Sequence, residues 1–353
     1  MLRALGLQEP PETRRVPPRG AMATPPLPLT LSETSWRGRP AFLLASRELC
    51  AVVTRTGAHV AALYDAADPA RASALWSPHW PAGDPAAAAA SGAWGAGEHA
   101  LEAPLLASIC GSNLCLDRFG APRAGEARPL HGEAGVVEWR LAAADGARAT
   151  FAAHLPLARL DVTRTLSFCG RALVLETRAR PDASGGARSP VEWAEHTTLG
   201  GPFLDGAVID AGVDAAAEMP APGAPAAAAA VDVAAALALP AAGDAPTGSV
   251  RTCRVVDGRW AATNAAAGWR LSARWARADF PWLCVWTEHR LRTHAPWAGR
   301  ERARGLELST KPFPEGAPPP ERDAEFLGAP AAPLTIPAGG EAVRVVELAW
   351  ERV

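Results

Sequence analysis

The sequence has no long apolar run, no strong net charge and no cysteines spaced as metal ligands. No stretch of its 353 residues approaches the ~20 apolar residues that a membrane helix requires. Its 35 basic and 37 acidic residues give a net charge of −2, which offers no electrostatic surface to nucleic acid or to an anionic membrane. We therefore predict a protein with neither of these partners.

The six cysteines are scattered along the chain, and only Cys110 and Cys115 lie close together. A zinc finger needs a second closely spaced pair, so the cysteine pattern predicts no metal ion. Free buried thiols suit a reducing cytoplasm, where we place the protein. The N-terminus has prolines and arginines in place of a signal-peptide core, so residues 1–27 are predicted to be a disordered tail, with Met22 as an alternative start.

Short segments of alternating apolar and polar residues dominate the rest. Residues 135–157 and 160–181 each contain two such runs, separated by Asp145-Gly146 and by Cys169-Gly170-Arg171, which suit tight turns. Residues 42–63 read as strand, turn and strand with a break at Gly57, and residues 343–348 alternate near the C-terminus. This pattern predicts an all-β fold, a large antiparallel β-sandwich in which residues 28–353 form one domain.

Helical signals are weak. The alanine tracts at 86–90 and 225–238 have helix propensity, but proline and glycine interrupt them and neither has an apolar stripe. We interpret both as surface insertions.

The chain has 13 tryptophans and one tyrosine, and several tryptophans stand beside acidic residues. Trp193 precedes Glu195, while Trp282 and Trp286 precede Glu288. Indole rings stack on the C–H faces of sugars and carboxylates accept hydroxyl hydrogen bonds, so this arrangement suits carbohydrate. Burial in the core of a large sandwich is the alternative for each tryptophan.

Three stretches combine histidine or glutamate with glycine and proline: "RPLHGEAGVVEW" (128–139), "VEWAEHTTLGGPF" (191–203) and "RGLELSTKPFPEG" (304–316). A single histidine in a β-protein is more often structural than catalytic. Two histidines and a glutamate in such contexts form a better candidate set.

The order of these stretches resembles the aldose 1-epimerase, or galactose mutarotase-like, superfamily. Its members have a His-Gly segment, a mid-chain histidine on a strand, and a late Leu-Glu stretch followed by Phe-Pro. The matching residues here are His131-Gly132, His196, Leu306-Glu307 and Phe313-Pro314. Residues 111–123, "GSNLCLDRFGAPR", are similar to a Gly-rich stretch of the hexose-6-phosphate mutarotase branch. The resemblance implies a β-supersandwich.

The sequence also departs from the family pattern. Gly135 stands where sugar-phosphate members usually have arginine, and Thr197 and Thr198 replace the aromatic residue and asparagine that are common after the second histidine. The substrate-binding aspartate of galactose mutarotases has no secure counterpart, and Asp257 and Glu288 are the candidates for it. These departures indicate a divergent branch.

The resemblance implies roles for individual residues. Glu307 would be the base and His196 the acid, two residue types whose ordinary pKa values of about 4.3 and 6.5 suit proton exchange near neutrality. His131 would bind the ring oxygen or hydroxyls. The further sugar-binding candidates are Asp117, Arg118 or Arg123, Glu288, Trp193 and Trp282. For Glu288, a salt bridge with Arg290 or Arg292 is an equal alternative.

The implied activity is interconversion of sugar anomers by a cofactor-independent isomerase, acting as monomer or homodimer on a small-molecule sugar. A non-catalytic carbohydrate-binding protein of the same fold is the alternative, and an accessory domain of a polysaccharide lyase or hydrolase is less favoured. We expect His131, His196 and Glu307 to converge on an open concave surface, with His196 and Glu307 within about 10 Å of each other.

Overall fold

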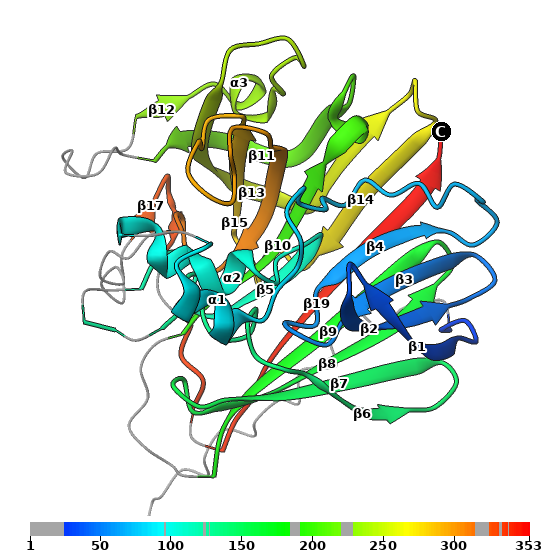
Figure 1. Ribbon diagram of the computed structural model, residues 1–353. Helices are drawn as coiled ribbons and strands as arrows, with labels where there is room; N and C mark the ends of the chain where they lie inside the picture. The colour runs from blue at the N-terminus through cyan, green and yellow to red at the C-terminus, as the bar shows by residue number, and fades with distance from the viewer. Residues whose placement is uncertain are drawn as a thin grey trace, which may run out of the picture.

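The computed structural model describes most of the chain, and its backbone is drawn in Figure 1. The described residues are 25–94, 97–122, 125–126, 128–183, 191–219, 229–314, 325–331, 334–337 and 339–353.

Strands predominate among these residues. In chain order they are β1 (Thr30–Trp36), β2 (Arg39–Ala45), β3 (Leu49–Thr54), β4 (Val60–Asp65), β5 (Ser112–Asp117), β6 (Arg140–Ala144), β7 (Arg148–Leu155), β8 (Leu160–Cys169), β9 (Ala172–Pro181), β10 (Glu192–Gly200), β11 (Val208–Glu218), β12 (Ala230–Val231), β13 (Thr247–Asn264), β14 (Trp269–Trp275), β15 (Trp282–His289), β16 (Arg302–Ser309), β17 (Glu325–Phe326), β18 (Ala329–Pro330) and β19 (Ala342–Arg352). The short helices are α1 (Pro85–Ser91), α2 (Ala103–Leu106) and α3 (Val233–Leu237), with 3₁₀ turns η1 (Gly97–Glu102) and η2 (Gly201–Leu204).

The pairing of these strands is antiparallel and nearly continuous. One series runs β1–β2–β3–β4, and β4 meets β5 at a single residue pair. From there the pairing continues through β5–β10–β16–β15–β13 and returns through β14–β19–β9–β8–β7–β6. The first half of the long strand β13 pairs with β15, and its second half pairs with β14. The predicted all-β antiparallel fold is therefore confirmed.

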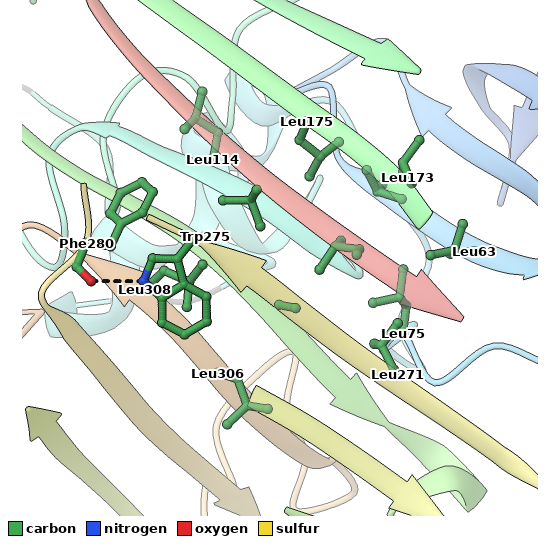
Figure 2. Packing of buried hydrophobic residues seen from close by; sticks show 14 of the residues in the cluster. Leu63, Leu75, Leu114, Leu173, Leu175, Leu271, Trp275, Phe280, Leu306 and Leu308 are labelled. Carbon is green, nitrogen blue, oxygen red and sulfur yellow. Dashed lines mark hydrogen bonds between the residues drawn. The ribbon is translucent and has the colours of Figure 1, made fainter. Parts of the chain in front are cut away.

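The layers enclose one large apolar core. Residues far apart in sequence meet in it, such as Phe42 of β2 and Phe151 of β7, whose ring centroids are 5.3 Å apart. Figure 2 shows leucines from several strands in this core together with Trp275, whose indole N–H donates to the Phe280 carbonyl at 3.0 Å. Burial of this apolar surface is the main stabilising contribution to the fold.

The hairpins predicted at two turns are present. The Asp145 carboxylate accepts backbone hydrogen bonds from Ala147 and Arg148, at 3.0 and 2.8 Å, and Gly146 adopts a φ of 79°. β6 and β7 flank this turn, and β8 and β9 flank Gly170 in the same way. Short turns that contain glycine thus set the register of the β6–β7 and β8–β9 pairs.

Two local predictions need correction. Residues 42–63 contain parts of three strands, because a turn at 46–48 separates β2 from β3 before the break at Gly57. The alanine tract at 86–90 forms helix α1: the Asp84 carboxylate caps the Ala87 N–H at 2.9 Å, Pro85 occupies the first turn, and Gly92 ends the helix with a φ of 65°. These capping residues define the beginning and the end of a helix, which the alanines alone did not indicate.

The predicted tail ends at residue 27, and the backbone of this residue contacts the β-sandwich. Residues 1–24 are outside the described part of the chain, and the N–H of Leu27 donates to the Phe168 carbonyl at 2.7 Å. The division into a tail and one domain stays a prediction. Among the described residues, no helix combines the length and apolar character needed to cross a membrane.

Candidate active site

The two residues proposed from sequence as acid and base lie side by side on neighbouring strands. His196 on β10 is the direct cross-strand partner of Glu307 on β16 and of Asn113 on β5. Glu307 in turn faces Cys284 on β15. Directly paired residues of an antiparallel sheet project from the same face, so Asn113, His196, Glu307 and Cys284 form one row across four strands.

Strand alternation determines which face carries this row. Leu306 and Leu308 flank Glu307 on β16, and both are packed in the main core, as Figure 2 shows. Because successive side chains of a strand point to opposite faces, Glu307 projects away from that core. We call this side of β5, β10, β16 and β15 the site face.

His196 and Glu307, which we call the dyad, are held by hydrogen bonds. His196 Nε2 lies 3.0 Å from Glu307 Oε1, and His196 Nδ1 lies 3.1 Å from the Thr198 hydroxyl. With a carboxylate on one side, the ring donates its Nε2–H to Glu307, and Nδ1 shares a hydrogen bond with the Thr198 hydroxyl, which can donate to a neutral ring or accept from a doubly protonated one. Thr198 was noted in the sequence only as a departure, and the structure shows that it orients the imidazole.

The dyad is covered rather than open. His196 and Glu307 expose only 5% and 2% of their side chains. Trp286 lies over the dyad, with its ring centroid 6.2 Å from that of His196, and is itself half-buried. The expectation of an open concave surface is therefore wrong for these two side chains, since neighbouring loops and rings cover the site face.

Gly305 provides the room that the dyad occupies. A Cβ atom at this position would lie 2.5 Å from Glu307 Oε1 and 3.2 Å from both His196 Cε1 and Trp286 Cβ. Only a residue without a side chain therefore fits here with the dyad in place.

Two buried oxygens in the row have no hydrogen-bond partner among the described residues: Glu307 Oε2 and Asn113 Oδ1. Buried polar atoms are nearly always paired, and exceptions occur at functional sites. The Asn113 amide also lies 3.5 Å from the sulfur of Cys115, the next site-face residue on β5. Asn113 and Glu307 flank His196 from either side. Asn113 lies in the sequence stretch 111–123, but nothing in the sequence indicated that it pairs with His196.

His131 lies beside the dyad, and its ring centroid is 5.4 Å from that of His196. Its backbone has a φ of 61°, a left-handed conformation that is strained for a non-glycine residue. The Gly120 N–H donates to His131 Nδ1 at 3.1 Å, which leaves the ring proton on Nε2. Burial, then the charges of His196, Lys311 and Arg292, lower the pKa of His131 well below its usual value. His131 is therefore a neutral donor.

Two thiols line the floor of the site face. Burial raises the pKa of Cys115 and of Cys284 well above the usual range, and the charge of Glu307 raises both further. Both cysteines therefore stay as neutral thiols beside the Glu307 carboxylate. Neither cysteine forms a disulfide.

The Asp117–Arg118 segment belongs to a charged cluster at one end of the site face. Arg118 donates to Glu192 at 3.2 Å and also to Glu126, while Asp117 accepts from Arg128. Both predicted sugar-binding residues thus have protein partners, and Arg118 is only 3% exposed. Asp117 nevertheless keeps one buried oxygen, Oδ1, without a hydrogen-bond partner among the described residues, and sugar binding by these two residues stays a prediction. Arg123 lies outside the described residues.

Lys311 joins this cluster, and it is the only lysine in the chain. Its ammonium group lies 2.9 Å from Glu192 Oε2, and the residue is 6% exposed. It follows Glu307 by four residues, and its charge acts on His131. The lysine carries no signal of its own in the sequence stretch 304–316.

Glu288 and the two predicted tryptophans do not reach a ligand surface. Glu288 accepts the backbone N–H groups of Leu291 and Arg292 at 2.7 and 3.0 Å, so it fixes the turn after β15. Trp193 is 0% exposed in the main core, on the face of β10 opposite His196. Trp282 is on the site face but also 0% exposed, under residues 326–331. The predictions for Trp193 and Trp282 are corrected, and Glu288 has the alternative contact, a salt bridge of 3.6 Å with Arg292. Trp286 is the indole beside the dyad.

On the core side, a buried ion pair fixes the strand that carries His196. Arg164 of β8 binds Glu195 through two parallel hydrogen bonds of 2.9 Å. Their side chains expose 0% and 3% of their surface. Since Glu195 precedes His196 on β10, this pair restrains the backbone of the dyad from behind.

Comparison with solved structures identifies the fold. A candidate aldose 1-epimerase from Klebsiella pneumoniae superposes with a TM-score of 0.63 at 13% identity, over 91% of this chain and 84% of the other. A candidate mutarotase from Salmonella typhimurium gives 0.61 at 13% identity, over 94% and 98%. A galactose mutarotase-like protein from Clostridium acetobutylicum gives 0.56 at 12% identity, over 92% and 99%.

The chain is thus a large antiparallel β-sandwich with a buried His–Glu pair on one sheet face. Its fold is the galactose mutarotase-like fold, as the resemblance in sequence predicted. No family model matches the chain, and no curated protein matches it in sequence. At such low identities, the structural likeness shows the fold, and the activity has to be argued from the site.

Proposed function

We propose that the protein interconverts the anomers of an aldose by acid–base catalysis, with Glu307 and His196 as the proton-transferring pair. The observation that carries this proposal is the 3.0 Å contact between His196 Nε2 and Glu307 Oε1, with the second Glu307 oxygen left without a partner among the described residues. One carboxylate oxygen thereby orients the histidine while the other is available to a substrate hydroxyl.

The reaction follows from these positions. Glu307 Oε2 takes the proton of the C1 hydroxyl, and doubly protonated His196 gives its Nε2–H to the ring oxygen as the bond between C1 and the ring oxygen breaks, which leaves a neutral imidazole and a protonated Glu307. C1 becomes an aldehyde carbon, turns about the C1–C2 bond, and the same pair closes the ring on its other face. The His196–Glu307 contact has to open as the ring oxygen takes the place of Glu307 Oε1.

Three neighbours support this chemistry. Neutral His131 presents an Nε2–H donor beside His196, and Asn113 offers an amide group on the other side of the dyad. Trp286, half-buried over the dyad, provides an indole face for the C–H groups of a sugar ring. Because Trp286 is partly exposed and lies over the dyad, its movement would admit the ligand.

The setting we propose is unchanged from the sequence analysis: a cytoplasmic protein, monomer or homodimer, that acts on a small sugar without a cofactor and without nucleic acid. The buried thiols of Cys110, Cys115, Cys253 and Cys284, which form no disulfides, and the near-neutral charge support it. Proton transfer between a carboxylate, an imidazole and a sugar needs no other reagent.

Polarimetry on freshly dissolved single anomers tests the proposal. The untagged protein is added to a panel of aldoses and of their 6-phosphates, and the rate of rotation change is compared with the buffer rate. We expect acceleration of at least one sugar. A protein that shifts its melting temperature with a sugar but accelerates none would be the non-catalytic binding protein, and this would overturn the proposal.

A further inference from the structure

A cluster of two histidines and a glutamate lies outside the candidate active site. His99 and Glu102 belong to η1, and His294 belongs to the loop 290–301 between β15 and β16. One donor atom from each of the three lies within 4.8 Å of the others. Two segments almost 200 residues apart in sequence thus bring together the side chains most common in zinc sites.

The distances within the cluster fit an ion better than direct hydrogen bonds. Glu102 Oε1 is 3.5 Å from His99 Nδ1, and Glu102 Oε2 is 3.9 Å from His294 Nε2. Protein hydrogen bonds of this type are about 2.7–3.2 Å long. Ligands held at ~2.1 Å around a tetrahedral zinc ion lie about 3.4 Å apart, close to the spacing observed.

Two of the possible ligand atoms are also buried and have no hydrogen-bond partner among the described residues. They are Glu102 Oε2 and His294 Nε2, which face each other. A buried carboxylate oxygen and a buried ring nitrogen at this separation each lack the interaction that burial normally requires. A shared cation satisfies both at once.

We propose that His99, Glu102 and His294 bind one divalent zinc ion. Two imidazoles and a carboxylate form a three-ligand set whose fourth position is taken by water, and nitrogen ligands favour zinc over magnesium or calcium. The prediction of no metal ion rested on the spacing of the cysteines alone and did not include these histidines and this glutamate. The ion would join η1 to the loop that carries Arg292, whose guanidinium lies 4.7 Å from the Trp297 ring and 5.4 Å from the Trp286 ring.

Binding requires one measurable rearrangement. The His99 and His294 rings are now stacked, with centroids 3.6 Å apart and planes 3° from parallel. A metal ion lies in the plane of each imidazole that binds it, so the two rings must turn away from parallel. Their side chains are 33% and 24% exposed, which leaves room for this rotation.

Titration calorimetry with zinc chloride tests the proposal on untagged, chelator-treated full-length protein. We expect one equivalent to bind to the wild type, and at least tenfold weaker binding in His99→Ala and in His294→Ala. His154→Ala is the matched control, because His154 also pairs with a carboxylate, Asp161, at 3.1 Å on an exposed surface. Binding by this variant should equal that of the wild type.

Melting curves in chelator establish that all variants are folded, and the cobalt-loaded protein should show a spectrum of nitrogen and oxygen ligands without a thiolate band. The absence of one-equivalent zinc binding at micromolar concentrations would overturn the proposal, as would binding that survives both histidine substitutions or that His154→Ala weakens equally. The readout is binding heat, so it is independent of sugar chemistry.

Discussion

Substituting Gly305 by alanine should damage the dyad more than the fold. The added Cβ would lie 2.5 Å from Glu307 Oε1, whereas ordinary van der Waals contact begins at 3.4 Å, so the carboxylate has to move by about 0.9 Å. A displacement of about 1 Å in a catalytic group can cost ~10²-fold in rate. We therefore expect anomer exchange to fall about 10²-fold in Gly305→Ala.

The cost in stability should be small by comparison. The closest contact is the end of a side chain rather than backbone, and Gly305 lies in a strand that accommodates alanine. Overpacking of this kind costs about 1–3 kcal/mol, and the loss of glycine freedom in the unfolded chain offsets about 0.4–1 kcal/mol. Urea unfolding measures the free energy, and polarimetry measures the rate.

Gly243→Ala is the control, because nothing lies within 4 Å of the atom it adds. It should keep the rate of the wild type, and its free energy of unfolding should rise by no more than about 0.4–1 kcal/mol, because the unfolded chain loses the freedom of the glycine. A Gly305→Ala protein with the full exchange rate would refute the reasoning, since the dyad geometry would then not matter to the reaction.

Three further predictions follow from buried groups. Burial lowers the pKa of His59 to about 4, so the folded state keeps it neutral and loses stability as pH falls from about 6.5 to about 4, by about 3 kcal/mol; urea unfolding of His59→Asn against wild type across this range measures it. Asn113→Leu removes an amide with a buried, unpaired oxygen, so kcat/KM should fall about 3–10-fold while the melting temperature changes little; an unchanged kcat/KM excludes a contact with substrate. Arg164→Met leaves Glu195 buried without its partner and should cost about 3–5 kcal/mol in urea unfolding, whereas Arg178→Met, at a surface ion pair, should cost under about 1 kcal/mol; equal costs would contradict this account.

Local sequence rules predicted the hairpins well, because turn and strands are neighbours in the chain. Asp145-Gly146 and Gly170-Arg171 each occupy the expected turn. The pairing that builds the site is of another kind: His196 meets Asn113 and Glu307, residues about 80 and 110 positions away. Nothing in one sequence specifies such partners, and only the resemblance in the order of the motifs brought His196 and Glu307 together.

The errors at the site also have physical causes. Trp193 and His196 are three positions apart on one strand, so alternation places them on opposite faces; this could have been read from the sequence once the segment was assigned as a strand. Trp282 is on the correct face, but the distant segment 326–331 covers it. The contacts of Arg118 with Glu192 and of Asp117 with Arg128 could not be recognised from the sequence.

The central claim is that Glu307 is the base of an anomer exchange, and the rate of Glu307→Gln tests it most directly. The amide keeps the size of the side chain and an oxygen to accept the His196 Nε2–H, but it cannot take a proton from the C1 hydroxyl. With the melting temperature recorded beside the polarimetric rate, we expect the rate to fall by ~10²–10⁴ and the melting temperature to stay near that of the wild type. A Glu307→Gln protein that exchanges anomers at the wild-type rate while melting at a lower temperature would show that Glu307 is a structural residue, and would contradict the account.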